Sequence, residues 1–146
     1  MYQELIDKKK KLAVIGLGYV GLPIALEFAK KISVIGFDVN AGRIKMMENA
    51  VDPSNELESS AFQSCDIEFT NSLDKLREAN FFIVAVPTPV DKHNVPDLTP
   101  VKRASDTIGK VIKKGDEVIF ESTVYPGCTE EDCLPIIESL SGLKSV

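Results

Sequence analysis

The sequence contains no tryptophan, a single histidine and only three cysteines among its 146 residues. Cys65, Cys128 and Cys133 cannot all form disulfides with one another, and their spacing is not that of metal ligands. We therefore expect a reducing compartment and no metal site. No apolar run approaches the roughly 18 residues that a membrane span needs, and no signal-peptide pattern is present. These absences predict a cytoplasmic protein with no membrane partner.

An excess of basic charge is also missing. The formal net charge is −5, and the one basic run, Lys8 to Lys11, directly precedes an apolar segment. A surface that binds nucleic acid is rich in Lys and Arg, so we expect no nucleic-acid partner. A hydrophobic content of 44% and a charged content of 27% are ordinary for a globular protein, and the length suits one domain.

A glycine motif is the most informative feature that is present. The apolar segment 12–15 runs directly into Gly16, Gly18 and Gly21, which have the G-x-G-x-x-G spacing, and a helical pattern from about residue 19 to residue 29 follows. We expect Gly16 to allow a tight turn, Gly18 to let the backbone approach a pyrophosphate, and Gly21 to let the helix pack closely on the strand. The helix would direct its N-terminal N–H groups at the phosphates.

Asp38 strengthens the prediction of a dinucleotide site. It ends a second apolar segment, 32–37, about 20 residues after the first glycine, where an acidic residue binds the ribose hydroxyls. A carboxylate would repel the 2′-phosphate of NADP by roughly 1–4 kcal/mol at about 4 Å, so the predicted cofactor is NAD. Arg43 could instead accommodate that phosphate, could flank the adenosine, or could be a solvated charge on the next helix.

Strands and helices alternate along the whole chain, which predicts an α/β fold. The order is that of a doubly wound, Rossmann-type parallel sheet with strand order 3-2-1-4-5, cut off before or at a sixth strand. Thr99 is expected to cap a helix whose first residue is Pro100, and Ser72 to cap another. The expected strands are 12–15, 32–37, 67–70, 81–86 and 117–121, and the expected helices are 19–29, 41–48, 72–79, 99–112 and one from 129.

Ligands of such sheets bind beyond the carboxyl ends of the strands. Besides the glycine loop, the segments 87–89 and 122–127 lie there, and Thr88, Ser122 and Thr123 place hydroxyl groups at these strand ends. Each hydroxyl could also serve only as a turn or cap, an alternative that is stronger for Ser122. His93 lies in a polar loop and is expected to be exposed rather than a catalytic base.

Four ordered motifs resemble the N-terminal domain of the UDP-glucose/GDP-mannose dehydrogenases. They are VIGLGYVGLPIALEFAK, VIGFDVNAGRI, FFIVAVPTPVDKHNVPDLTP and VIFESTVYPGCTEEDCLPIIE, which together span about residues 11 to 143. The variants GLP and ESTVYPG are more similar to the UDP-N-acetylhexosamine 6-dehydrogenases than to the UDP-glucose enzymes. We therefore expect residues 1–146 to be the NAD-binding part of a longer enzyme.

The resemblance implies oxidation of the C6 alcohol of a UDP-sugar to a uronic acid, with two NAD per sugar and a cysteine-bound thioester intermediate. It also implies a homodimer and a role in polysaccharide biosynthesis. The one catalytic residue it places in this chain is Thr123, which would help to orient the catalytic water. The cofactor residues it implies are Gly16, Gly18, Tyr19, Val20, Gly21, Asp38, Arg43, Val86, Pro87, Thr88, Glu121, Ser122 and Thr123.

The family's nucleophilic cysteine motif is missing from this sequence. Cys65 precedes a strand, away from the expected site, and Cys128 matches no nucleophile of the family. Cys133 faces an acidic helix start, which would raise the pKa of its thiol. We therefore expect the chain alone to be inactive. Two alternatives remain from the sequence: a regulatory module that binds NAD without chemistry, and another NAD-dependent dehydrogenase, such as one acting on 3-hydroxy acids.

Overall fold

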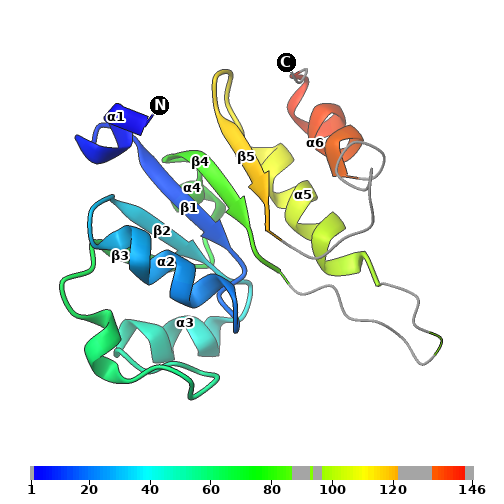
Figure 1. Cartoon of the computed structure of the whole chain (residues 1–146). Coiled ribbons are helices and arrows are strands. Elements are labelled where there is room, and N and C mark those ends of the chain that lie inside the picture. Colours follow the sequence, from blue (N-terminus) through cyan, green and yellow to red (C-terminus); the bar gives the residue numbers. More distant parts are fainter. Residues whose placement is uncertain (1, 87–92, 94–96, 122–132, 144–146) are drawn as a thin grey trace.

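A five-stranded parallel sheet forms the centre of the molecule (Figure 1). The computed structural model describes residues 2–86, 93, 97–121 and 133–143. The strand order β3-β2-β1-β4-β5 confirms the order predicted from the sequence. The strands are β1 (Lys11–Ile15), β2 (Val34–Phe37), β3 (Ile67–Thr70), β4 (Ala79–Val84) and β5 (Glu117–Phe120).

Helices cover both faces of this sheet, which is why β1 has nearly every side chain buried. Leu12 and Val14 pack with α2 on one face, whereas Ala13 and Ile15 pack with α5 and α6 on the other. None of the described helices is long and apolar enough to cross a membrane. The helices are α1 (Tyr2–Ile6), α2 (Gly21–Ala29), α3 (Ala41–Glu48), α4 (Leu73–Leu76), α5 (Thr99–Val111) and α6 (Leu134–Ser141), with a 3-10 turn η1 (Ser59–Phe62).

The predicted helix over 72–79 is wrong in its second half. Helix α4 ends at Leu76, and Ala79 already belongs to β4, where it pairs with Lys11 of β1. The carbonyl oxygens of Arg77 and Ala79 accept hydrogen bonds from Lys113 Nζ at 2.7 and 2.9 Å. A lysine more than 30 residues away in the sequence thus satisfies two carbonyls that follow the end of α4.

The two predicted caps also differ in detail. Ser72 is the N-cap of α4, but its side chain makes no capping bond, and its N–H donates to Thr70 Oγ1 at 3.0 Å. Thr99 is the first helical residue of α5 rather than its cap, and its N–H donates to the carboxylate of Asp97 at 2.9 Å. An acidic residue at this position suits the positive end of the helix dipole.

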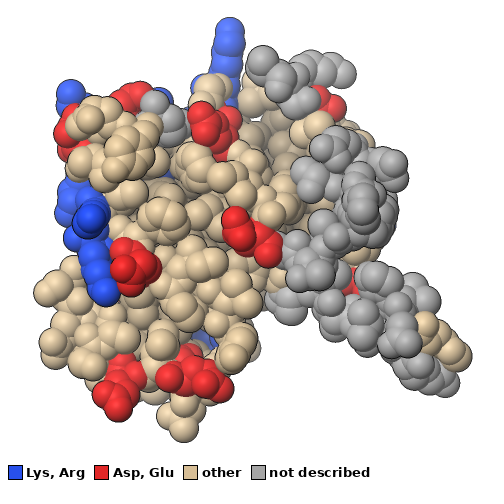
Figure 2. Space-filling model, in the orientation of Figure 1, with Lys and Arg blue, Asp and Glu red and all other residues tan. Residues whose placement is uncertain are grey.

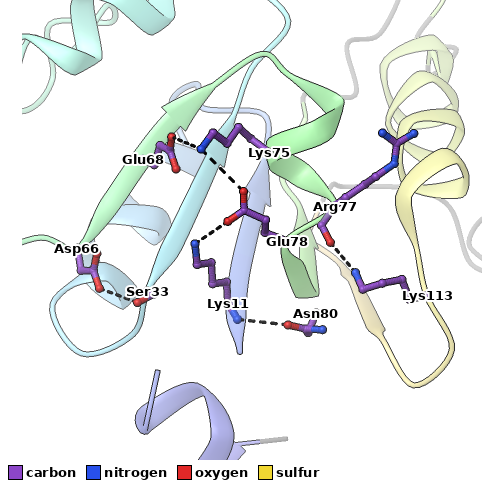
Figure 3. A network of polar contacts seen from close by, with 9 residues as sticks. All are labelled: Lys11, Ser33, Asp66, Glu68, Lys75, Arg77, Glu78, Asn80 and Lys113. Atoms are coloured by element: carbon purple, nitrogen blue, oxygen red, sulfur yellow. Dashed lines mark hydrogen bonds and ion pairs between the residues drawn. The ribbon is translucent and has the colours of Figure 1, made fainter. Parts of the chain in front are cut away.

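Ion pairs and hydrogen bonds join the amino ends of the strands (Figure 3). Lys11 Nζ lies 2.9 Å from Glu78 Oε1, and Lys75 Nζ lies 3.5 Å from Glu68 and 3.9 Å from Glu78. Lys8 pairs with Asp66 in the same region at 2.8 Å. Lysines of the basic run 8–11 therefore form ion pairs, and these charges lie at the sheet end opposite the glycine loop.

Candidate functional site

The glycine loop joins β1 to α2 at the carboxyl end of the sheet. Gly16 has a φ of +93°, which L side chains rarely adopt, and a Cβ there would come within 2.8 Å of Val86. A Cβ on Gly21 would lie 1.7 Å from the carbonyl oxygen of Gly16 and 3.2 Å from Ala85. The positive φ of Gly16 and the close packing of Gly21 therefore fit the roles predicted for them.

Gly18 differs from the other two glycines because a side chain there would not be crowded. A Cβ there would meet only the guanidinium of Arg43, at 3.9 Å. None of the described residues accepts a hydrogen bond from the backbone N–H of Gly18, Tyr19 or Val20. Helix α2 begins at Gly21, two residues later than predicted, and Tyr19 and Val20 are exposed. Open backbone N–H groups before a helix are a suitable site for phosphate oxygens.

Asp38 follows β2 and directs its carboxylate toward the glycine loop. Its Oδ2 accepts a hydrogen bond from the N–H of Leu17 at 3.2 Å, and its Oδ1 accepts one from the N–H of Asn40 at 3.0 Å. The side chain is 13% exposed. These two N–H groups hold the carboxylate in place while leaving acceptor capacity for ligand hydroxyls, because an ionised carboxylate has about four lone-pair sites.

Arg43, in the first turn of α3, joins the ends of β1 and β2. Its Nε lies 3.6 Å from Asp38 Oδ2, and its guanidinium donates to the carbonyl oxygen of Leu17 at 2.9 Å. Asn40 caps the helix by accepting a hydrogen bond from the N–H of Arg43 at 3.1 Å. The alternative of a freely solvated helix charge is therefore wrong, since this side chain is half-buried and bonded at the site.

A cavity of about 370 Å³ opens beside these residues, within the range of about 300–1,000 Å³ usual for small-molecule sites. Part of its wall, from α5, was not predicted from the sequence. The signal that could have found it is the spacing of Pro100, Arg103 and Thr107, which lie on one helical face. The lining residues are Ile15, Gly16, Leu17, Gly18, Phe37, Asp38, Val39, Arg43, Val86, Pro100, Arg103, Ala104 and Thr107.

The other predicted site residues divide between described and undescribed segments. Val86 lines the cavity, and Glu121, just beyond β5, is exposed, with its N–H donating to Val84 at 2.8 Å. His93 is exposed, as expected, and Cys65 precedes β3 at the opposite end of the sheet. Pro87, Thr88, Ser122, Thr123 and Cys128 lie outside the described residues.

The comparison with known families decides among the dehydrogenase classes. The pattern of the UDP-glucose/GDP-mannose dehydrogenase family, NAD binding domain, matches residues 10–145. The chain belongs to this family. Its cofactor is NAD, and the family match decides against a dehydrogenase of the 3-hydroxy acid type that shares only the glycine motif.

Relatives of the UDP-glucose/GDP-mannose dehydrogenase family align with nearly the whole chain. The UDP-N-acetyl-D-glucosamine 6-dehydrogenases of Pseudomonas aeruginosa and Salmonella typhi are 54% and 51% identical over 94% and 91% of this chain. The crystal structure of an NDP-N-acetyl-D-galactosaminuronic acid dehydrogenase from Methanosarcina mazei superposes with a TM-score of 0.83 at 30% identity, covering 98% of this chain and 34% of that one. The chain spans about a third of the length of the curated relatives it matches (33% and 32%).

Proposed function

We propose that residues 1–146 form the NAD-binding domain of a nucleotide-sugar 6-dehydrogenase. The complete enzyme would oxidise the C6 alcohol of a UDP-sugar, a UDP-N-acetylhexosamine, to the uronic acid. This oxidation removes two hydrides per sugar, and one water supplies the second carboxylate oxygen. Bound NAD would supply the hydride acceptor. The central and C-terminal parts of the enzyme would hold most of the sugar and the cysteine nucleophile.

The position of Asp38 beside the glycine loop is the observation that carries this proposal. Asp38 and Gly18, whose backbone N–H is open, line the same cavity at the carboxyl ends of β1 and β2. This arrangement fits a dinucleotide whose pyrophosphate lies on the loop and whose ribose lies on Asp38. It also favours NAD over NADP, because a 2′-phosphate would approach a carboxylate that is already held in place.

We assign the remaining roles from the family motifs. Tyr19 and Val20, with the three glycines of the loop, would hold the pyrophosphate, and Arg43 would lie on the adenosine side. The segments around Thr88 and Thr123 would border the ribose and phosphates, with Thr123 also orienting the catalytic water. Further cofactor contacts would come from Val86, Pro87, Glu121 and Ser122.

The cellular setting is proposed on the same basis. We infer a homodimeric cytoplasmic enzyme that supplies uronic acids for polysaccharide biosynthesis and has neither nucleic acid nor membrane as a partner. The negative net charge supports the absence of a nucleic-acid surface. Similarity to relatives that act on UDP-N-acetyl-D-glucosamine supports the substrate class.

Calorimetry tests the cofactor site. The protein is expected to bind NAD more tightly than NADP, and Asp38→Ala is expected to weaken NAD binding and to reduce this preference. Asp38→Asn is the matched variant, because it keeps one oxygen acceptor and removes the charge that would repel a 2′-phosphate. NADP binding equal to or tighter than NAD binding would contradict the assignment.

Absorbance of NADH tests the chemistry. The complete polypeptide is expected to form NADH with a UDP-N-acetylhexosamine, whereas the 146-residue chain alone is expected to remain at baseline. A complete polypeptide that binds NAD and oxidises no UDP-sugar would favour the non-catalytic regulatory module. Turnover by the chain alone that disappears in Cys128→Ser would show that this cysteine is a nucleophile.

A further inference from the structure

Arg103 lies on α5 and lines the same cavity as Asp38 and Arg43. Among the residues that the structure describes, no hydrogen bond or ion pair holds its guanidinium. Its charge contributes, after the hydrogen bond from Thr99, to keeping the pKa of Asp97 below its ordinary value. Arg103 is thus an exposed cation at the cavity wall, and its side chain is available to a ligand.

The glycine loop and Asp38 determine the direction in which a dinucleotide would lie. The open N–H groups of Gly18 and Tyr19 suit the pyrophosphate, and the carboxylate of Asp38 suits the adenosine ribose. Since the base and the pyrophosphate leave the ribose from different carbons, the base extends beyond Asp38, away from the glycine loop. Residues of α5 line the same cavity as Asp38 and are therefore candidates to meet the base.

The chemistry of this cavity suits a flat heteroaromatic ring. Val39, Val86, Pro100 and Ala104 line the cavity with apolar groups, and Arg103 lines it as a cation. A guanidinium is planar and stacks on aromatic faces through cation–π attraction. Val39 is 82% exposed, so a bound base would remove an apolar side chain from water.

We propose that Arg103 binds the adenine ring of the dinucleotide by stacking its guanidinium on the ring face, with Ala104 and Val86 forming the apolar slot. This inference rests on the proposed function, since it requires the cavity to hold NAD. Arg103 would then determine affinity for the adenosine half of the cofactor. It would have no part in the hydride transfer.

Calorimetric titration with NAD and with ADP-ribose tests this role in Arg103→Ala, Arg103→Lys and the control Lys102→Ala. Lys102 is an exposed cation on the same helix that does not line the cavity. Arg103→Ala is expected to weaken both ligands equally, by roughly 2- to 30-fold, because both contain adenine. Arg103→Lys is expected to recover only part of this loss, since an ammonium lacks the stacking plane. Lys102→Ala should bind both ligands as the unaltered protein does.

The salt dependence of binding distinguishes an Arg103 that stacks on adenine from an Arg103 that binds a phosphate of the cofactor. Raising sodium chloride from about 50 to about 500 mM screens exposed charge pairs. If Arg103 stacks on adenine, the loss of affinity in Arg103→Ala should largely persist at high salt. If Arg103 binds a cofactor phosphate, that loss should disappear. Unchanged affinity in Arg103→Ala, or full recovery in Arg103→Lys with loss of the effect at high salt, would overturn the inference alone. Absence of NAD binding by the unaltered protein would overturn the proposed function with it.

Discussion

Arg43 Nε lies 3.6 Å from Asp38 Oδ2, and the guanidinium also donates to the carbonyl oxygen of Leu17 at 2.9 Å. Through these two contacts a residue of α3 connects the loop after β1 with the end of β2. The carboxylate that is proposed to bind the ribose is thereby held by the same arginine that is proposed to border the adenosine.

Replacing Arg43 by methionine should affect both folding and cofactor binding. We expect the free energy of unfolding to fall by about 1–2 kcal/mol, because a half-buried ion pair and a charged hydrogen bond are lost. NAD affinity should fall as well, and Arg43→Lys should restore the charge but not both contacts. Denaturant titration and calorimetry measure the two effects. Lys45→Met is the control on the exposed side of α3, and equal stability of Arg43→Met and the control would contradict the prediction.

Alanine substitutions at Gly21 and Gly18 should affect different properties, the first the stability of the fold and the second the affinity for NAD. Gly21→Ala places a Cβ 1.7 Å from a backbone oxygen, so we expect a loss of about 3 kcal/mol or more in the free energy of unfolding. Gly18→Ala places its Cβ in ordinary contact with the Arg43 guanidinium, at 3.9 Å, and should change that free energy by less than about 1 kcal/mol. Its NAD affinity should nevertheless fall by at least about tenfold, because the methyl group occupies the phosphate approach. Thermal unfolding and calorimetry on both variants decide this, and tight NAD binding by Gly18→Ala would contradict the assigned role.

Asp52 should make the stability of the loop after α3 depend on pH. Burial alone would raise the pKa of this carboxyl, but hydrogen bonds from the N–H groups of Ser54, Leu57 and Glu56, at 2.8–2.9 Å, lower it below its ordinary value of 3.8. The stabilisation is therefore complete above the unfolded-state pKa and is lost as the pH falls through the lower folded-state pKa.

Urea unfolding between about pH 6 and pH 2 measures this contribution. Asp52→Ala should lose about 2–3 kcal/mol at neutral pH, because three N–H groups lose a charged acceptor. Asp52→Asn should keep the acceptor for Glu56 and Leu57, lose less stability, and show a flatter dependence below about pH 4. A slope identical to that of the unaltered protein would show that Asp52 does not contribute.

Strand β5 lies at the edge of the sheet formed by the described strands, and it should promote self-association. Ile119 is 43% exposed and lines an apolar cavity of about 460 Å³ with Phe28 and Tyr2. Uncharged residues make up most of this face, with acidic side chains among them (Figure 2), and Glu117 and Glu121 also line the cavity. We expect either dimers that dissociate in Ile119→Lys or an edge covered by residues 143–146.

Sedimentation and hydrogen exchange separate these outcomes. The N–H of Glu121 donates to β4, and backbone directions alternate along a strand, so the N–H groups of Val118 and Phe120 point outward. Protection of these two amides is expected in either case. Rapid exchange of both in a strictly monomeric sample would show that the edge stays open.

Local patterns in the sequence were sufficient for much of the fold. The glycine spacing, the apolar segments and the acidic residue after the second strand predicted the sheet order, and the bounds of α3 and β3 were predicted correctly. These features depend on neighbours within one turn or one strand, so the order of residues is enough to specify them. The same patterns placed Asp38 beside the glycine loop, because parallel strands end at one edge of the sheet.

Contacts between distant segments were decided only by the tertiary structure. Lys113 donates hydrogen bonds to the carbonyls of Arg77 and Ala79, just after α4 ends. Arg43 of α3 donates to the carbonyl of Leu17, in the loop after β1. Arg103 came to the cavity wall because α5 packs beside the ends of β1 and β4. No local pattern specifies which side chains meet over such separations, since the meeting depends on how helices pack against the sheet. The sequence by itself determined the elements and the dinucleotide motif, whereas helix packing determined which charges meet at the site.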